Sequence, residues 1–271
     1  MSYNSAYRQD TQSTMSNLNL EYTRNVVNGI RSTFLSGPPP PPPPPTIDPN
    51  LLFDVKFDNS LDVDYSKDGS ALTFEAKNGA FTPNDGFITV NPNNYLRLTT
   101  GLPSYIKHTG DQSWVVNFQT NTSGATRFVV HTAPPEGSRE TTLLIRTGIF
   151  LLLYGTTLYF TVFKGPGDVL VDVPSTIGDV DLTVNVNSVV GTYRRSDHMS
   201  SLYFNGVLIK QLAAPAGNEA SVMDWSTADN LYVNKSFRFT PNQNTDYHKI
   251  TAYDKILTPE EIVDIYNASQ L

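Results

Sequence analysis

The feature that most constrains this chain is a run of eight consecutive prolines, residues 38–45. Each proline lacks a backbone N–H and has a fixed φ, so the run cannot form the interior of a helix or a sheet. It predicts a polyproline II rod of roughly 25 Å, at about 3.1 Å per residue. A ligand for a proline-binding module is the alternative, but the flanks lack the basic residue that usually orients such ligands. We therefore interpret the run as a spacer between an arm, residues 1–37, and a globular domain, residues 46–271.

The arm shows helical periodicity from Leu18 to Leu35, where apolar residues recur every four positions. A helix of this length is marginal in water by itself, so the apolar stripe needs a partner. The partner could be the chain's own domain, other copies of the arm or a different protein. Because the proline spacer would hold the arm away from its own domain, we favour an anchoring or assembly role, including self-association. The residues predicted to make these contacts are Tyr22, Val26, Val27, Ile30 and Phe34.

Composition excludes several classes of protein. The net charge is −7 and the pI about 5.0, whereas nucleic-acid binding requires clusters of Lys and Arg to neutralise phosphates. The absence of cysteine excludes disulfides, thiolate metal sites and cysteine nucleophiles. The longest apolar run, Ile149 to Tyr154, is too short to span a bilayer, and residues 1–17 do not resemble a signal peptide. We therefore expect neither a nucleic-acid partner nor a membrane span, and assembly inside the cell.

The globular part contains about a dozen short stretches with strand-like alternation, separated by turn residues, which predicts an all-β sandwich or barrel. Asn205-Gly206 is the strongest hairpin signal, because both residues tolerate positive φ. The predicted strands include Leu51–Asp58, Phe87–Val90, Tyr95–Leu98, Ser113–Phe118, Phe128–His131, Thr141–Arg146, Ile149–Tyr154, Leu158–Phe163, Val169–Val173, Leu182–Val190, Ser201–Ile209 and Leu231–Asn234.

The last stretch, Tyr247 to Leu271, predicts one strand followed by one short helix. Apolar residues alternate with polar ones up to Tyr253, as a half-buried strand requires. Thr258 can then cap a helix, and Pro259 suits its first position. Ile262, Ile265 and Tyr266 share one helical face. This helix should pack back onto the domain through that apolar face.

These motifs resemble those of the laminin-G-like, or concanavalin-A-like, jelly-roll domains, over residues 50–271. That family closes on a segment matched here by Tyr253, Asp254, Lys255, Leu257, Thr258, Glu260, Glu261, Ile262 and Tyr266. Its Gly-Thr-Tyr segment is matched by residues 191–193, and its Tyr-x-Asn-Gly hairpin by residues 203–206. The resemblance implies a two-sheet jelly-roll sandwich with a short C-terminal helix.

The sequence does not predict an enzyme. Glycosidases of this fold carry a Glu-x-Asp-x-x-Glu strand, which supplies the two carboxylates of a retaining mechanism. The nearest stretch here, Val222 to Ser226, has only one acid. The four histidines are scattered, and a nucleophile-elbow motif is absent. We therefore name no catalytic residues.

Two kinds of binding site remain to be considered. Many relatives hold Ca²⁺ in loops at the rim of a sheet, and Asp58, Asp62 and Asp64 could contribute ligands. However, His248 stands where relatives often have an Asp, so we favour a solvated acidic loop and no cofactor. Glycan binding would need exposed aromatic and amide side chains, for which the candidates are Tyr105, Trp225, Tyr232, Tyr247, Asn242 and Asn244.

The leading functional hypothesis is a structural component of a virion, such as a minor capsid, decoration or fibre protein. Its arm would bind other particle proteins, and its jelly-roll head would project. The alternative is a carbohydrate-binding adhesin, with or without Ca²⁺, that contacts cell-surface glycans. A glycosidase with an unusual pair of acids is the weakest of the three hypotheses.

Overall fold

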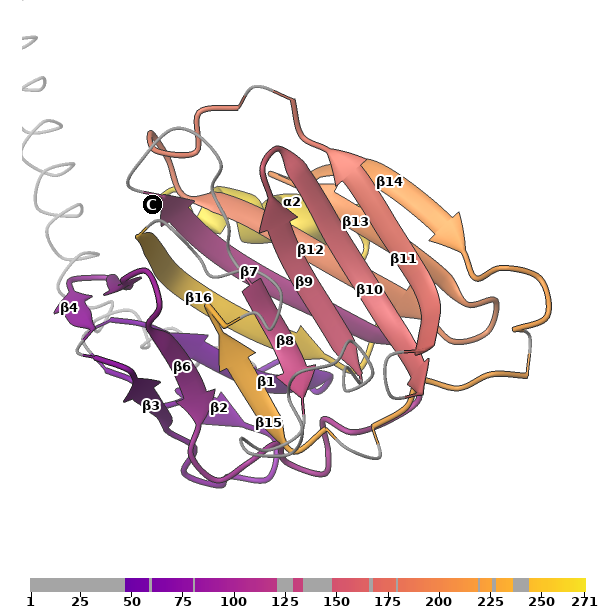
Figure 1. Ribbon diagram of the computed structural model, residues 1–271, viewed down its shortest axis with the longest axis horizontal. Helices are drawn as coiled ribbons and strands as arrows, with labels where there is room; N and C mark the ends of the chain where they lie inside the picture. Colours follow the sequence, from indigo (N-terminus) through magenta and orange to yellow (C-terminus); the bar gives the residue numbers. More distant parts are fainter. Residues whose placement is uncertain are drawn as a thin grey trace, which may run out of the picture. The chain divides into compact units, whose positions relative to one another are not determined.

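The computed structural model describes residues 47–58, 60–79, 81–120, 129–133, 148–165, 168–178, 180–218, 220–225, 228–235 and 244–271. Residues Asp48–Leu271 form a compact unit of their own. This unit is an all-β sandwich of two antiparallel sheets with one short helix (Figure 1). The proline spacer and the predicted assembly residues of the arm lie outside the described residues, as does Asn242.

The described strands form a nine-stranded and a seven-stranded sheet. The first sheet has the order β14-β13-β12-β7-β16-β1-β2, with β5 also pairing with β16, and β4 with β5. Its strands are β1 (Leu51–Lys56), β2 (Tyr65–Ser66), β4 (Thr82–Asn84), β5 (Phe87–Val90), β7 (Gln112–Thr120), β12 (Asn187–Arg194), β13 (Met199–Phe204), β14 (Val207–Ala213) and β16 (Thr245–Tyr253). The second sheet has the order β11-β10-β9-β8-β15-β6-β3, made of β3 (Phe74–Lys77), β6 (Tyr95–Leu98), β8 (Val129–Ala133), β9 (Ile149–Tyr154), β10 (Thr157–Gly165), β11 (Asp168–Thr176) and β15 (Asn230–Val233).

The core lies between the two sheets and follows the alternation of each strand. Trp114, Val116 and Phe118 of β7 belong to one buried cluster with Leu151 of β9 and Phe160 of β10. Such interdigitation is what holds two packed sheets together, because the apolar area removed from water grows with every strand. The side chains that alternate with these core residues along each strand face away from the core. On the nine-stranded sheet, these outward-facing side chains form the surface on which the candidate site lies.

Helix α2 (Pro259–Ala268) covers part of that outer face. Thr258 forms a capping box with Glu261: its hydroxyl accepts from the Glu261 N–H at 3.2 Å, and the Glu261 carboxylate accepts from the Thr258 N–H at 2.8 Å. Ile262 of the helix packs in a cluster with Val115 and Val190. The predicted helix, its cap and its apolar face are therefore confirmed.

One predicted strand differs from the structure and one is not tested by it. The strand expected over Leu182–Val190 begins only at Asn187, because the Asp181 carboxylate accepts hydrogen bonds from the Thr183 N–H at 2.9 Å and hydroxyl at 2.7 Å. Such local side-chain bonds compete with strand pairing and favour a turn. The strand expected over Thr141–Arg146 lies outside the described residues. The Asn205-Gly206 turn is confirmed, with φ of 49° and 80°.

Candidate ligand-binding groove

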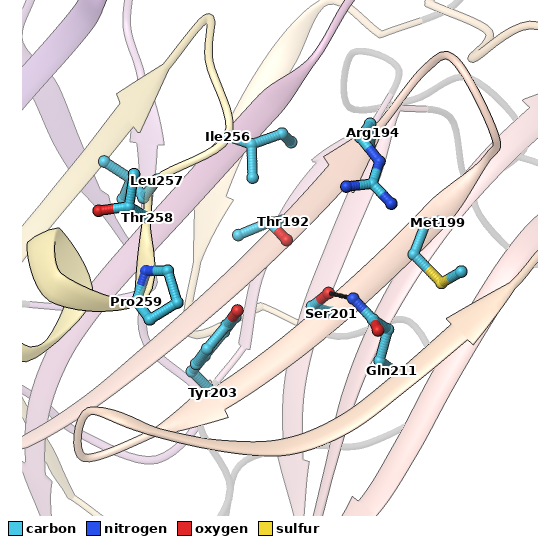
Figure 2. Close-up of a pocket in the computed structure, with 10 residues that line it drawn as sticks. All are labelled: Thr192, Arg194, Met199, Ser201, Tyr203, Gln211, Ile256, Leu257, Thr258 and Pro259. Atoms are coloured by element: carbon cyan, nitrogen blue, oxygen red, sulfur yellow. Dashed lines mark hydrogen bonds between the residues drawn. The ribbon is translucent and has the colours of Figure 1, made fainter.

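A groove of about 290 Å³ lies on the outer face of the nine-stranded sheet. Its floor is a row of residues that strand register places side by side: Thr192 of β12 pairs with Ser201 of β13, which pairs with Gln211 of β14. The Gln211 amide donates to the Ser201 hydroxyl at 2.8 Å, which fixes the orientation of both side chains (Figure 2). The floor therefore presents hydroxyl and amide groups in a set geometry.

Two walls border this row. The segment Ile256 to Pro259, which leads into α2, forms one wall, and Arg194 and Met199 from the β12–β13 hairpin lie on the opposite side (Figure 2). Tyr203 is placed one row further along β13, beside the helix. The walls contribute most of the apolar surface and the floor contributes most of the polar groups.

The first wall is fixed to the sheet by one serine. The Ser113 hydroxyl accepts a hydrogen bond from the Leu257 N–H at 3.0 Å and donates to the Lys255 carbonyl at 2.7 Å. Ser113 is fully buried and pairs with Thr192 in the same row. Both backbone groups of the loop are thus satisfied at the point where it crosses the sheet, so this wall is pre-formed.

Tyr203 supplies a phenol that stays protonated. Burial raises the pKa of its hydroxyl, because the phenolate form would lose hydration there. A protonated phenol can both donate and accept a hydrogen bond. Tyr203 is therefore suited to a ligand group with the same double capacity, such as a hydroxyl.

The one charged residue that lines the groove is already paired. The Arg194 guanidinium donates to the two carboxylate oxygens of Asp197, with Nε–Oδ1 at 2.9 Å and Nη2–Oδ2 at 2.7 Å. This bidentate hydrogen bonding lowers the pKa of Asp197 and raises that of Arg194. The guanidinium and carboxylate therefore remain charged and largely offset each other at the end of the groove.

The described residues also form a second hollow, of about 490 Å³, which is a weaker candidate for a ligand-binding site. It is bordered by Arg97, Lys107 and Asp229. Lys107 lies 3.2 Å from Asp229, and the Arg97 guanidinium donates to one oxygen, Oε1, of Glu75, from Nε at 2.7 Å and also from Nη2. These charges satisfy one another, and the hollow lacks the walls that enclose the groove beside α2.

The residues predicted from the sequence to bind a glycan do not form a common site. Tyr232 and Tyr247 are fully buried, so the expectation of exposed rings does not hold for them. Trp225 is 7% exposed, and its indole N–H donates to the His108 carbonyl at 2.7 Å. Alternation alone could not separate these aromatic side chains from the core, since large rings contribute most to burial in a sandwich. Tyr105 and Asn244 belong to other segments, and neither lines the groove.

The acidic residues Asp58, Asp62 and Asp64 lie on the opposite edge of the domain. Asp62 accepts hydrogen bonds from the Thr73 hydroxyl at 2.7 Å and the Ser60 hydroxyl at 2.9 Å, which lower its pKa. Asp64 accepts from the Lys56 N–H at 2.6 Å. The carboxylates of Asp62 and Asp64 thus have local donors as partners. In the part of the chain that the structure describes, three His, Asp or Glu residues nowhere gather closely enough to hold a metal ion.

The sequence did not identify the groove residues, because what distinguishes them is their position in the folded sheet and not a local sequence pattern. Thr192, Ser201 and Gln211 are ordinary outward-facing residues of three strands, and each fits a solvated sheet surface. What brings them together is the register of β12, β13 and β14, which includes a bulge beside Tyr203. The motifs at residues 191–193 and 203–206 and the closing segment with Leu257 and Thr258 marked parts of this region, but as features of the fold.

Comparison with protein-family models gives no match, and neither does comparison with curated protein sequences. Solved structures match in fold. The binding domain of botulinum neurotoxin DC in complex with SialylT has a TM-score of 0.59 at 13% identity, and covers 82% of this chain and 52% of that chain. The same domain in complex with rat synaptotagmin II has a TM-score of 0.59 at 12% identity, with 83% and 53% covered. The receptor-binding domain of the mosaic serotype C/D toxin gives 0.60 at 11% identity, with 82% and 52% covered.

At sequence identities of 11–13%, these comparisons show only that the fold is shared. This chain spans about half the length of the matched chains. The two-sheet sandwich expected from the sequence is confirmed. Membership of the laminin-G-like family remains a prediction from the motifs. Helix α2, with its 10 residues, falls short of the length needed to cross a bilayer, and no other helix in the described residues reaches it.

Proposed function

We propose that this protein is a non-enzymatic binding module whose sandwich domain recognises carbohydrate on a cell surface through the groove beside α2. The observation that carries the proposal is the groove itself, where a hydrogen-bonding floor faces apolar walls (Figure 2). Ligand sites typically combine a mainly apolar lining with a few fixed polar groups. The toxin domains that share the fold are described as receptor-binding, and one is in complex with SialylT, which supports a binding role for this fold but does not assign a ligand here.

The chemistry of the groove also favours binding over hydrolysis. A glycosidase needs two carboxyl groups on either side of the scissile bond. The groove presents three hydroxyls, a phenol, an amide and a guanidinium, and the described residues that line it include no Asp or Glu. We therefore propose no catalytic role and no metal cofactor.

The direct test is binding of the full-length chain to an array of immobilised glycans, with and without a calcium chelator. We expect chelator-resistant binding that Gln211→Arg abolishes, because a long charged side chain at this exposed position would lie across the floor. Val207→Arg, at an exposed position on the same strand, is the matched control and should bind as the wild type does. Equal binding by both variants would contradict a role for the groove.

A second proposal, that the protein is a virion component, is favoured by the sequence of the arm and the eight-proline spacer. In this case the arm would bind particle proteins and the sandwich would be the projecting, receptor-binding part. Immunogold labelling and mass spectrometry of purified particles would test it. Absence of the protein from any particle would rule it out without affecting the proposal for the groove.

A further inference from the structure

We infer that the ligand of the groove is a neutral sugar ring, and that the paired charges of Arg194 and Asp197 exclude acidic glycans. This inference deepens the proposed function and depends on it. The donors, acceptors and charges around the floor determine which class of carbohydrate the groove accepts.

The polar groups of the floor match hydroxyls. Thr192, Ser201 and Thr258 contribute hydroxyl groups, Tyr203 a protonated phenol and Gln211 an amide with both donors and an acceptor. A hydroxyl on the ligand can donate to one of these groups while accepting from another. A sugar ring carries several such hydroxyls around its edge, whereas an apolar ligand would offer no partner to the polar groups that it covers, which is unfavourable.

The walls match the apolar faces of a ring. Met199 lies on one side of the floor, and Ile256 and Pro259 lie on the other (Figure 2). Since a pyranose presents C–H groups on its faces and hydroxyls on its edge, it could contact both kinds of surface at once. The volume of about 290 Å³ is at the small end of ligand pockets, which typically measure about 300–1,000 Å³. The groove therefore suits one ring at a time, with the rest of a glycan outside it.

The charges argue against an acidic ligand. Among the described residues that line the groove, Arg194 is the one cation, and its Nε and Nη2 donate to the two carboxylate oxygens of Asp197. A carboxylate or sulfate on a sugar could bind the remaining N–H groups of Arg194 only close to the Asp197 carboxylate, which repels it. Glu260 in the first turn of α2 adds negative charge beside the other wall, whereas the charge of Glu261 is offset by Lys255. An anionic sugar would thus meet like charge on two sides.

One substitution should add binding to acidic glycans, and two others should weaken binding to neutral glycans. Asp197→Asn removes the competing carboxylate and frees Arg194, so this variant should acquire measurable binding to sialylated or uronic-acid-bearing glycans while keeping its affinity for neutral ones. Thr192→Val and Gln211→Ala each remove hydrogen-bonding groups from the floor. We expect each to weaken neutral-glycan binding on the order of tenfold, with Lys210→Ala, the neighbouring position on β14, as the matched control.

The experiment titrates the full-length chain and these variants against a panel of neutral, sialylated and sulfated oligosaccharides, with thermal melting of each variant to verify folding. Neutral-sugar binding that the two floor variants weaken, together with the gain by Asp197→Asn, is the expected result. Preference of the wild type for acidic glycans would overturn the inference but leave the proposed function in place. Binding to no member of the panel would overturn both.

Discussion

At the scale of single residues, Gly191 shows how closely the core limits the strand that carries the groove. It lies in β12 next to Thr192, and a Cβ at this position would overlap the ring of Phe160 from the opposite sheet. Overpacking of a filled core typically costs about 1–3 kcal/mol. We predict that Gly191→Ala lowers the free energy of unfolding by an amount in this range, as measured by urea denaturation.

The control is Gly165→Ala in β10, where an added Cβ would lie 3.5 Å from the Asp168 Cβ, an ordinary contact distance. This variant should unfold close to the wild type. If both variants were equally stable, the two sheets would be packed less tightly around Phe160 than the structure indicates.

The residue scale is also where prediction from the sequence was weakest. Tyr232 and Tyr247 were candidates for sugar contacts, but they are core side chains. Gln211, by contrast, is a single polar residue in an edge strand and carries no motif. Its importance arises from its pairing with Ser201 and from a wall contributed by Ile256 to Pro259, about 50 positions later in the sequence. Such a site depends on long-range register, which local patterns do not contain.

At the scale of elements, the capping box of α2 links stability to the groove wall. Thr258 both caps the helix and lines the groove. Removal of an N-cap side chain costs about 0.5–2 kcal/mol, so Thr258→Ala should reduce stability by roughly this amount and also weaken ligand binding. Thr258→Ser, which keeps the hydroxyl, should restore stability. Chemical denaturation and glycan titration of both variants would check this, and unchanged stability of Thr258→Ala would contradict it.

The ion cluster beside the helix predicts a dependence of stability on pH. Lys255 binds Asp48 at 2.7 Å and also Glu261. Burial by itself would raise the pKa of Asp48 and of Glu261. Hydrogen bonds from Lys255, together with those from Asn50 to Asp48 and from the Thr258 N–H to Glu261, outweigh it, and both pKa values lie below their usual 3.8 and 4.5. A lowered pKa in the folded state means that the stabilisation is complete above the unfolded-state value and is lost as the pH falls through the folded-state value.

We therefore expect Lys255→Met to be less stable than the wild type at pH 7, and the difference to shrink as the pH falls below about 4. Urea denaturation of both proteins at pH 7 and pH 3 measures it. Glu260→Gln, on the same helical turn, serves as the control, since Glu260 makes neither of these contacts with Lys255. A difference that stayed constant with pH would mean that Lys255 contributes through its aliphatic stem alone.

Elements were largely predictable because their signals are local. The capped helix, the Asn205-Gly206 turn and most strands follow from alternation and turn chemistry over fewer than ten residues. The strand expected from Leu182 failed where Asp181 formed a side-chain turn, which the apolar alternation of Leu182, Val184 and Val186 concealed. Sheet order, and with it the floor of the groove, follows from non-local pairing that no single segment specifies.

At the scale of the whole molecule, the sandwich and the arm pose separate questions, because Asp48–Leu271 forms a compact unit of its own. We expect residues 46–271 to fold alone, since the core clusters of the described residues are built from side chains between Leu52 and Ile262. A cooperative thermal transition of this fragment, at a temperature close to that of the full chain, would verify it. A clearly lower transition temperature would show that the arm contributes to the stability of the sandwich.

We expect the arm to set how many binding sites act together. Its apolar stripe, which includes Val26 and Ile30, is predicted to associate with copies of itself or with another protein, at a distance set by the eight-proline spacer. If copies associate, several weak grooves would face one surface, and the avidity would exceed the affinity of one site. We predict that light scattering gives an oligomeric mass for the full chain and a monomeric mass for residues 46–271, and that Val26→Asp with Ile30→Asp returns the full chain to a monomer. Monomers in every case would exclude self-association, and the arm would then require a different protein, so that pull-down with residues 1–37 becomes the decisive experiment.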